Sequence, residues 1–197
     1  MDNIHKQYGY IELIIGPMFS GKTSKLLELY KQHKFCNIKS VIINHTIDTR
    51  YNENSNTIST HDNIVSPCLK VENLSTLWSN TYKHAELLNS SIILINEGQF
   101  FNDLYEVVCD MVTYNKQIYI CGLDGDFKRK PFGQILNLIP MCDKVTKLTS
   151  ICAYCKNGTS GIFSSRVTNE VCQTVIGSDN YKPVCRNCYK YMQFIIN

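Results

Sequence analysis

The sequence predicts an α/β fold in which a mostly parallel sheet is covered by helices on both faces, followed by a small cysteine-rich unit. Between residues 10 and 150, short apolar segments alternate with segments of helical periodicity. After about Thr149, glycine, cysteine and polar residues replace this alternation. We therefore expect two domains, one over residues 1–149 and a smaller one over residues 150–197.

Five apolar segments are expected to form the strands of the sheet, because their β-branched runs are typical of strands buried on both faces. They are Tyr10–Ile15, Ser40–His45, Ser91–Ile95, Gln117–Cys121 and a weaker one near Lys144–Leu148. Apolar stripes at helical spacing predict helices at Thr23–Lys34, about Thr76–Leu88 and Asp103–Tyr114. The polar segment Thr46–Asn63 is expected to be a long surface loop.

The composition favours a globular protein and disfavours several other classes. With 44% hydrophobic and 19% charged residues, the chain can bury a core. The net charge of +3 and the pI near 8.3 are too mild to predict a dedicated nucleic-acid surface. Apolar runs are too short to span a bilayer, and the first residues lack the apolar core of a signal peptide. We expect a cytoplasmic protein that does not bind membranes.

A glycine-rich loop follows the first expected strand and fits the pattern G-x-x-x-x-G-K-[ST]. It consists of Gly16, Pro17, Met18, Phe19, Ser20, Gly21, Lys22 and Thr23. In such a P-loop the glycines let backbone N–H groups converge on a phosphate, and the next helix adds its positive dipole end. Lys22 would reach the β- and γ-phosphates, and the Thr23 hydroxyl would ligate Mg²⁺. The sequence therefore predicts a P-loop (RecA-like) domain that binds a nucleoside triphosphate.

The expected strand Ser91–Ile95 is followed by Asn96 and Glu97, where a P-loop protein normally carries an acidic residue for Mg²⁺. Asn96 is neutral, but its amide oxygen can still accept a hydrogen bond from a metal-bound water. Glu97 is the next carboxylate and the candidate general base for phosphoryl transfer to an alcohol. The alternative for Glu97 is a solvated residue at the start of a helix.

Four of the ten cysteines form two C-x-x-C pairs, Cys152 with Cys155 and Cys185 with Cys188. Two thiolates from each pair would give a closed tetrahedral site for structural Zn²⁺, with no position left for catalysis. Redox dithiols and packed cysteines are the alternatives. Because of its length, the segment between the pairs, residues 156–184, is expected to be a lid or binding loop, and a solvated excursion is the alternative.

These segments together resemble the type II thymidine kinases of cells and poxviruses, over nearly the whole chain. Gly16–Lys22 is similar to that family's own form of the P-loop, and Glu97–Phe101 to its D-E-G-Q-F-F box without the first residue. Leu123–Phe132 and Ile135–Pro140 are close to family signatures, and the four paired cysteines stand in the family's place.

The resemblance implies transfer of the ATP γ-phosphate to the 5′-hydroxyl of thymidine, with Glu97 as the base, Mg²⁺ bound with ATP and structural Zn²⁺. It implies that Phe127 packs against the thymine ring, with Tyr181 nearby, and that Met18 and Leu123 line the pocket near the thymine methyl. The cysteine-held segment would form a lasso loop that recognises the base through the backbone of Gln173, Thr174, Val175, Ile176 and Gly177. A homotetramer inhibited by thymidine triphosphate is also implied.

Two other functions stay open at this point. Because Asn96 replaces the family's aspartate, the chain is alternatively a nucleotide-binding member with impaired catalysis. A P-loop ATPase whose zinc ribbon acts on nucleic acid is the second alternative, and the mild charge disfavours it.

Overall fold

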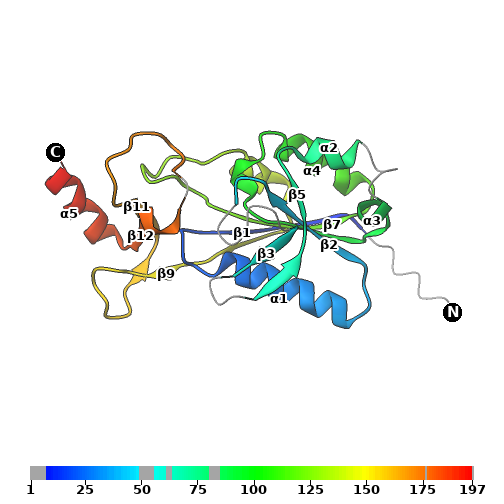
Figure 1. Ribbon diagram of the computed structural model, residues 1–197, viewed down its shortest axis with the longest axis horizontal. Helices are drawn as coiled ribbons and strands as arrows, with labels where there is room; N and C mark the ends of the chain where they lie inside the picture. The colour runs from blue at the N-terminus through cyan, green and yellow to red at the C-terminus, as the bar shows by residue number, and fades with distance from the viewer. Residues whose placement is uncertain (1–7, 49–55, 61–63, 80–84, 176, 197) are drawn as a thin grey trace.

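A computed structural model describes residues 8–48, 56–60, 64–79, 85–175 and 177–196 of the chain (Figure 1). Within these residues a six-stranded sheet has the order β5-β2-β6-β7-β1-β8, and every neighbouring pair is parallel. The strands are β1 (Tyr10–Ile15), β2 (Ser40–His45), β5 (Leu69–Val71), β6 (Ile92–Ile95), β7 (Gln117–Gly122) and β8 (Lys144–Lys147). The predicted parallel α/β sheet is thus confirmed. The three-residue strand β5 was not among the expected strands.

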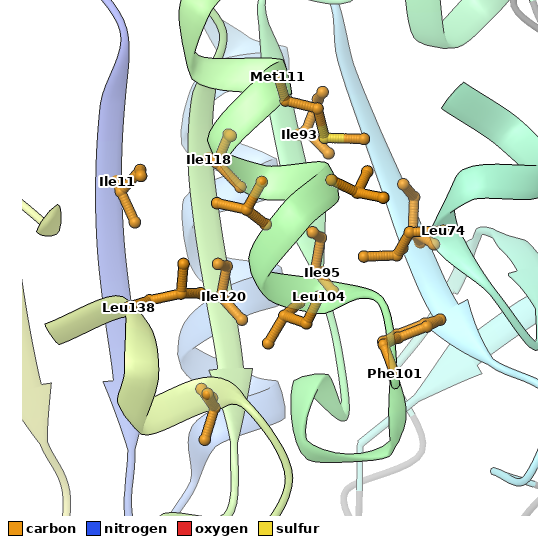
Figure 2. Close-up of a cluster of buried hydrophobic side chains, with 14 of the residues drawn as sticks. Ile11, Leu74, Ile93, Ile95, Phe101, Leu104, Met111, Ile118, Ile120 and Leu138 are labelled. Atoms are coloured by element: carbon orange, nitrogen blue, oxygen red, sulfur yellow. The ribbon is translucent and has the colours of Figure 1, made fainter. Parts of the chain in front are cut away.

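Helices cover both faces of this sheet, as predicted. The α1 helix (Lys22–Phe35) lies on one face, and α2 (Leu74–Trp78), α3 (Ala85–Asn89) and α4 (Leu104–Thr113) lie on the other (Figure 1). The strands alternate accordingly: Ile14 packs with Leu26 of α1, whereas Ile11 packs in the cluster that contains α4. Figure 2 shows Ile118 and Ile120 directed toward α4.

Two expected segments differ from the structure. The helix expected over about Thr76–Leu88 is described as two short helices, α2 and α3, and residues 80–84 lie outside the described residues. The segment expected as one surface loop contains β3 (Thr57–Ser59), which pairs antiparallel with β4 (Val65–Pro67). Ile58 of β3 is buried in the α1-side core, and one apolar residue among polar ones gives no periodicity to detect.

The C-terminal segment folds around a small core of its own. It contains β9 (Ser150–Ile151), β10 (Ser160–Gly161), β11 (Phe163–Arg166), η3 (Ser178–Asn180), β12 (Tyr181–Val184) and α5 (Arg186–Ile196). These elements gather at one end of the molecule (Figure 1), where Cys152, Val184, Cys185 and Tyr189 are buried together. The boundary predicted at residues 149 and 150 stays a prediction. In the described part of the chain, every helix is too short or too polar to cross a membrane.

Candidate active site

The candidate site is a cleft of about 1120 Å³, counting the part open to solvent, at the carboxyl ends of the central strands. In parallel α/β sheets this edge is the usual place for a ligand. The cleft is lined by the glycine-rich loop after β1, Glu97 after β6, and Leu123 and Phe127 after β7. From the C-terminal segment it is lined by Gln173–Val175, Gly177 and Tyr181. Segments far apart in the sequence therefore meet at one cavity, whereas the predicted Ile176 lies outside the described residues.

The glycine-rich loop depends on glycine at both ends. Gly16 has φ of 150°, and a Cβ atom there would lie 2.4 Å from the Leu148 carbonyl oxygen. Gly21 has φ of 82° and caps α1, so a side chain there would be strained. Of the loop residues, Met18–Thr23 line the cleft, while Gly16 and Pro17 shape the loop behind it. The N-terminus of α1 consequently opens on the cleft with its positive dipole end.

Lys22, the first residue of α1, folds back over this loop. Its Nζ atom donates to the Pro17 carbonyl oxygen at 2.6 Å, and the Ser20 hydroxyl donates to the same oxygen at 2.8 Å. The Lys22 side chain lines the cleft although it is largely buried. The Lys22 ammonium is therefore held at the loop, in position to contact an anion that binds there.

Thr23 lines the cleft, and its side chain meets that of Asn96, which is buried. The Thr23 hydroxyl donates to Asn96 Oδ1 at 3.3 Å, and Cys121 Sγ lies 2.9 Å from the same oxygen. Asn96 is fully buried, and its Nδ2 donates to Asn44 Oδ1 at 2.9 Å. Asn44 in turn donates to Asp48 at 3.0 Å. The amide thus has partners on both sides, and the Asn44 partner was missed because nothing local in the sequence marks it.

Glu97 occupies a left-handed backbone conformation, with φ of 54°, directly before η1 (Gly98–Phe100). Gln99 orients its carboxylate, since Gln99 Nε2 donates to Glu97 Oε2 at 2.7 Å. Gln99 Oε1 accepts from the Leu123 backbone N–H at 2.9 Å, so one buried amide links the ends of β6 and β7. Strain in a side-chain-bearing residue is typical of functional positions. Sequence reasoning identified Glu97 but not the positioning role of Gln99.

Two of the hydrogen bonds that join the C-terminal segment to the rest of the cleft were not identified by sequence reasoning. Ser164 of β11 accepts a hydrogen bond from the Met18 backbone N–H at 2.9 Å. The Gln173 side chain donates to Asp126 Oδ2 at 2.9 Å, while Asp126 Oδ1 accepts from the backbone N–H groups of Lys128 and Lys130. Both contacts join residues more than 40 positions apart, so no motif could reveal them.

The four paired cysteines gather at the base of the same segment. Their Sγ atoms lie within 4.8 Å of one another, and Cys155 Sγ is 3.7 Å from Cys185 Sγ and 3.5 Å from Cys188 Sγ. These distances are too long for disulfides. They suit a tetrahedral metal, for which Zn–S bonds of about 2.3 Å place the sulfurs roughly 3.8 Å apart. The cluster could therefore hold a metal ion, and no disulfide joins cysteines in the described part of the chain.

Comparison with known proteins identifies relatives over nearly the full length. A sequence model of the family described as "Thymidine kinase" matches residues 9–189. The thymidine kinase of Myxoma virus (strain Uriarra) is 40% identical over 182 residues, covering 92% of this chain and 96% of that protein. The thymidine kinase of Vaccinia virus (strain Ankara) is 38% identical over 182 residues, covering 92% of this chain and 97% of that protein. Thymidine kinase 1 of Dictyostelium discoideum is 36% identical, covering 92% of this chain and 78% of that protein.

Proposed function

Since the chain belongs to the thymidine kinase family, we propose that it transfers the γ-phosphate of ATP to the 5′-hydroxyl of thymidine to give dTMP. The observation that carries the proposal is that one cleft brings the glycine-rich loop, the Glu97 carboxylate and the aromatic residues Phe127 and Tyr181 together. The phosphates of ATP and the thymine ring of the phosphate acceptor would therefore bind next to each other in this cleft.

ATP would bind with its phosphates in the glycine-rich loop. The backbone N–H groups at the start of α1 and the Lys22 ammonium face the cleft, and these groups stabilise the charge that develops on a transferring phosphoryl group. On binding, the β- and γ-phosphate oxygens would replace the Pro17 carbonyl as partner of Lys22. This exchange keeps the ammonium hydrogen-bonded throughout.

Thr23 and Asn96 are the residues that would hold Mg²⁺. Both present oxygen atoms, which Mg²⁺ prefers, and their side chains already meet at 3.3 Å. Mg²⁺ supplies neutralisation of the charge on the β- and γ-phosphates. Because Asn96 brings no charge of its own, we expect a weaker hold on the metal than an aspartate would give.

Glu97 would act as the general base. It would accept the proton of the thymidine 5′-hydroxyl as that oxygen attacks the γ-phosphorus, and ADP would leave from the opposite side. Gln99 keeps the carboxylate directed at the cleft. A carboxylate offers about four lone-pair sites, of which the hydrogen bond from Gln99 uses one.

Thymidine would occupy the side of the cleft formed by Phe127, Tyr181, Gln173–Val175 and Gly177, with Met18 and Leu123 near the thymine methyl. Zn²⁺ is the metal we assign to the cysteine cluster, because four thiolates form the closed site typical of structural zinc. The homotetramer and the inhibition by thymidine triphosphate stay predictions, as does the cytoplasmic location.

The test is an assay of the purified chain with Mg²⁺, γ-labelled ATP and thymidine. We expect labelled dTMP at about 1–100 per second, the range of ordinary kinases. Thymidine binding without turnover would instead support the impaired member that Asn96 suggests. ATP hydrolysis that depends on added DNA, with no dTMP formed, would contradict the proposal.

A further inference from the structure

Arg166 is a buried arginine at the end of β11, behind the side of the cleft assigned to thymidine. Arg166 is only 4% exposed, although burying an isolated charge is costly in free energy. In the β11–β12 pair it stands opposite Tyr181. A buried guanidinium must have hydrogen-bond partners, and these partners indicate what it does.

The partners of Arg166 belong to the loop of residues 167–180 or to Tyr181 at the end of that loop. Its two terminal nitrogens donate to the carbonyl oxygens of Glu170 at 2.8 Å, Cys172, and Gln173 at 2.9 Å. The second of these nitrogens also donates to the Tyr181 hydroxyl at 2.6 Å. One side chain thus fixes three carbonyls of a single loop and the tyrosine that follows it.

The same guanidinium also fixes two aromatic rings of the cleft. Its Cζ atom lies 3.8 Å from the centre of the Phe127 ring and 5.2 Å from that of Tyr181. The Tyr181 hydroxyl, held by Arg166, accepts from the Val175 backbone N–H at 3.2 Å. Phe127, Tyr181 and Val175 all line the cleft, so Arg166 sets their mutual positions from behind.

We propose that Arg166 is a positioning residue that orders the loop of residues 167–180 before thymidine arrives, and thereby sets the affinity for thymidine. This inference rests on the proposed function. A loop ordered in advance saves the conformational entropy that binding would otherwise cost. Lysine could not replace Arg166, because its ammonium lacks the planar fork that joins several acceptors while stacking on a ring.

The first experiment follows hydrogen exchange of the loop in the free protein, with no nucleoside present. In Arg166→Lys we expect the amides of residues 167–175 to exchange faster than in the unmodified protein, while the amides of β1 and β7 are unchanged. Equal exchange of the loop in both proteins would overturn the proposal. This readout does not depend on which nucleoside the cleft accepts.

The second experiment measures substrate affinities by calorimetry and kinetics. Arg166→Lys should raise the thymidine Kd and KM at least about tenfold, as expected from loss of charge-assisted hydrogen bonds, with the ATP Kd changed less than about twofold. The kcat at saturating thymidine should be retained. Parallel weakening of ATP and thymidine would indicate a merely structural role and contradict the inference. Absence of dTMP formation by the unmodified protein would contradict the proposed function instead.

Two further variants control these measurements. Arg129→Lys is the matched control, because the Arg129 guanidinium lies 4.5 Å from the centre of the Tyr189 ring but does not line the cleft. The thymidine Kd of this variant should be unchanged. Tyr181→Phe removes the hydroxyl that joins Arg166 to Val175 and decides the matter if Arg166→Lys does not fold. We expect a thymidine Kd about threefold higher in Tyr181→Phe, and less than additive loss in the double variant. Unchanged affinity in Tyr181→Phe, or full additivity, would overturn the proposal.

Discussion

The glycine-rich loop and the loop of residues 167–180 line the same cleft, but they are held in different ways. The first is one continuous segment between a buried strand and the 14-residue helix α1, and its shape follows from its own glycines. The second is held by side chains outside it: Arg166 at its start, Asp126 after β7, and the cysteine cluster at the far end of the β11–β12 pair that carries the loop.

The first loop is therefore shaped by its own sequence, whereas the second depends on contacts with residues outside it. A substitution in the glycine-rich loop acts where it is made, because the backbone of that segment is itself the binding surface. The loop of residues 167–180 is sensitive to changes at supports that lie outside it. We therefore expect the affinities for ATP and thymidine to respond to different sets of substitutions.

The largest effect is expected at Glu97, which lines the same cleft as the two regions. Glu97→Gln removes the base but keeps the shape of the side chain, so turnover should fall by about 10²–10⁴-fold. Affinities for ATP and thymidine should stay near those of the unmodified protein, as calorimetry would measure. Unchanged turnover would remove Glu97 as the base.

Removal of zinc should affect the two regions unequally. A chelator should loosen the β11–β12 pair that carries the loop of residues 167–180, raising the thymidine Kd by about tenfold or more, with little change for ATP. Calorimetry on the chelated and the zinc-restored protein would measure both affinities. An equal loss for both substrates would show that the cysteine cluster supports the entire fold.

Asn96→Asp should have two opposite effects. A carboxylate beside Thr23 should lower the Mg²⁺ concentration for half-maximal rate several-fold or raise the rate. It would also face Asn44 Oδ1, an acceptor, so the free energy of unfolding should fall by about 1–3 kcal/mol. Kinetics at varied Mg²⁺ and urea unfolding would measure the two effects.

A second variant tests the cause of the stability loss. Asn44→Ser added to Asn96→Asp supplies a hydroxyl donor for the carboxylate and should recover part of the stability. If Asn96→Asp alters neither the rate nor the Mg²⁺ requirement, Asn96 does not limit metal use.

The smallest effect is expected on the free energy of unfolding when the pH falls, and it comes from His45 in the sheet. His45 is buried at the end of β2, and its Nδ1 accepts from the Ile47 backbone N–H at 3.0 Å. Burial lowers the pKa of His45 below its usual value near 6.5. Below about pH 6.5 the unfolded chain therefore binds a proton that the folded one does not, and the free energy of unfolding falls.

The test of this pH effect is His45→Asn, whose amide oxygen can still accept from Ile47. The decline in the free energy of unfolding between pH 7 and pH 5 should become shallower, as urea titrations at several pH values would measure. The same slope in both proteins would show that another group causes the acid loss, such as His33, whose pKa burial also lowers.

The four central strands of the sheet were predictable because they are runs of β-branched and other apolar residues buried on both faces. Short β5 and the β3–β4 pair have too few apolar residues to stand out, and their place depends on tertiary packing. The glycine-rich loop, Glu97 and the paired cysteines were found because their chemistry requires fixed spacing along the chain. Gln99, Asp126, Ser164 and Arg166 were missed as contributors because their partners become visible only once the chain is folded.

The hydrogen bond between the Met18 N–H and Ser164 has a thermodynamic consequence. It is a direct contact between the segment proposed to bind ATP and the strand that leads into the loop proposed to bind thymidine. If ATP shifts this contact and thereby changes the affinity for thymidine by some factor, linkage requires thymidine to change the affinity for ATP by the same factor. The order in which the substrates arrive would then leave the stability of the ternary complex unchanged.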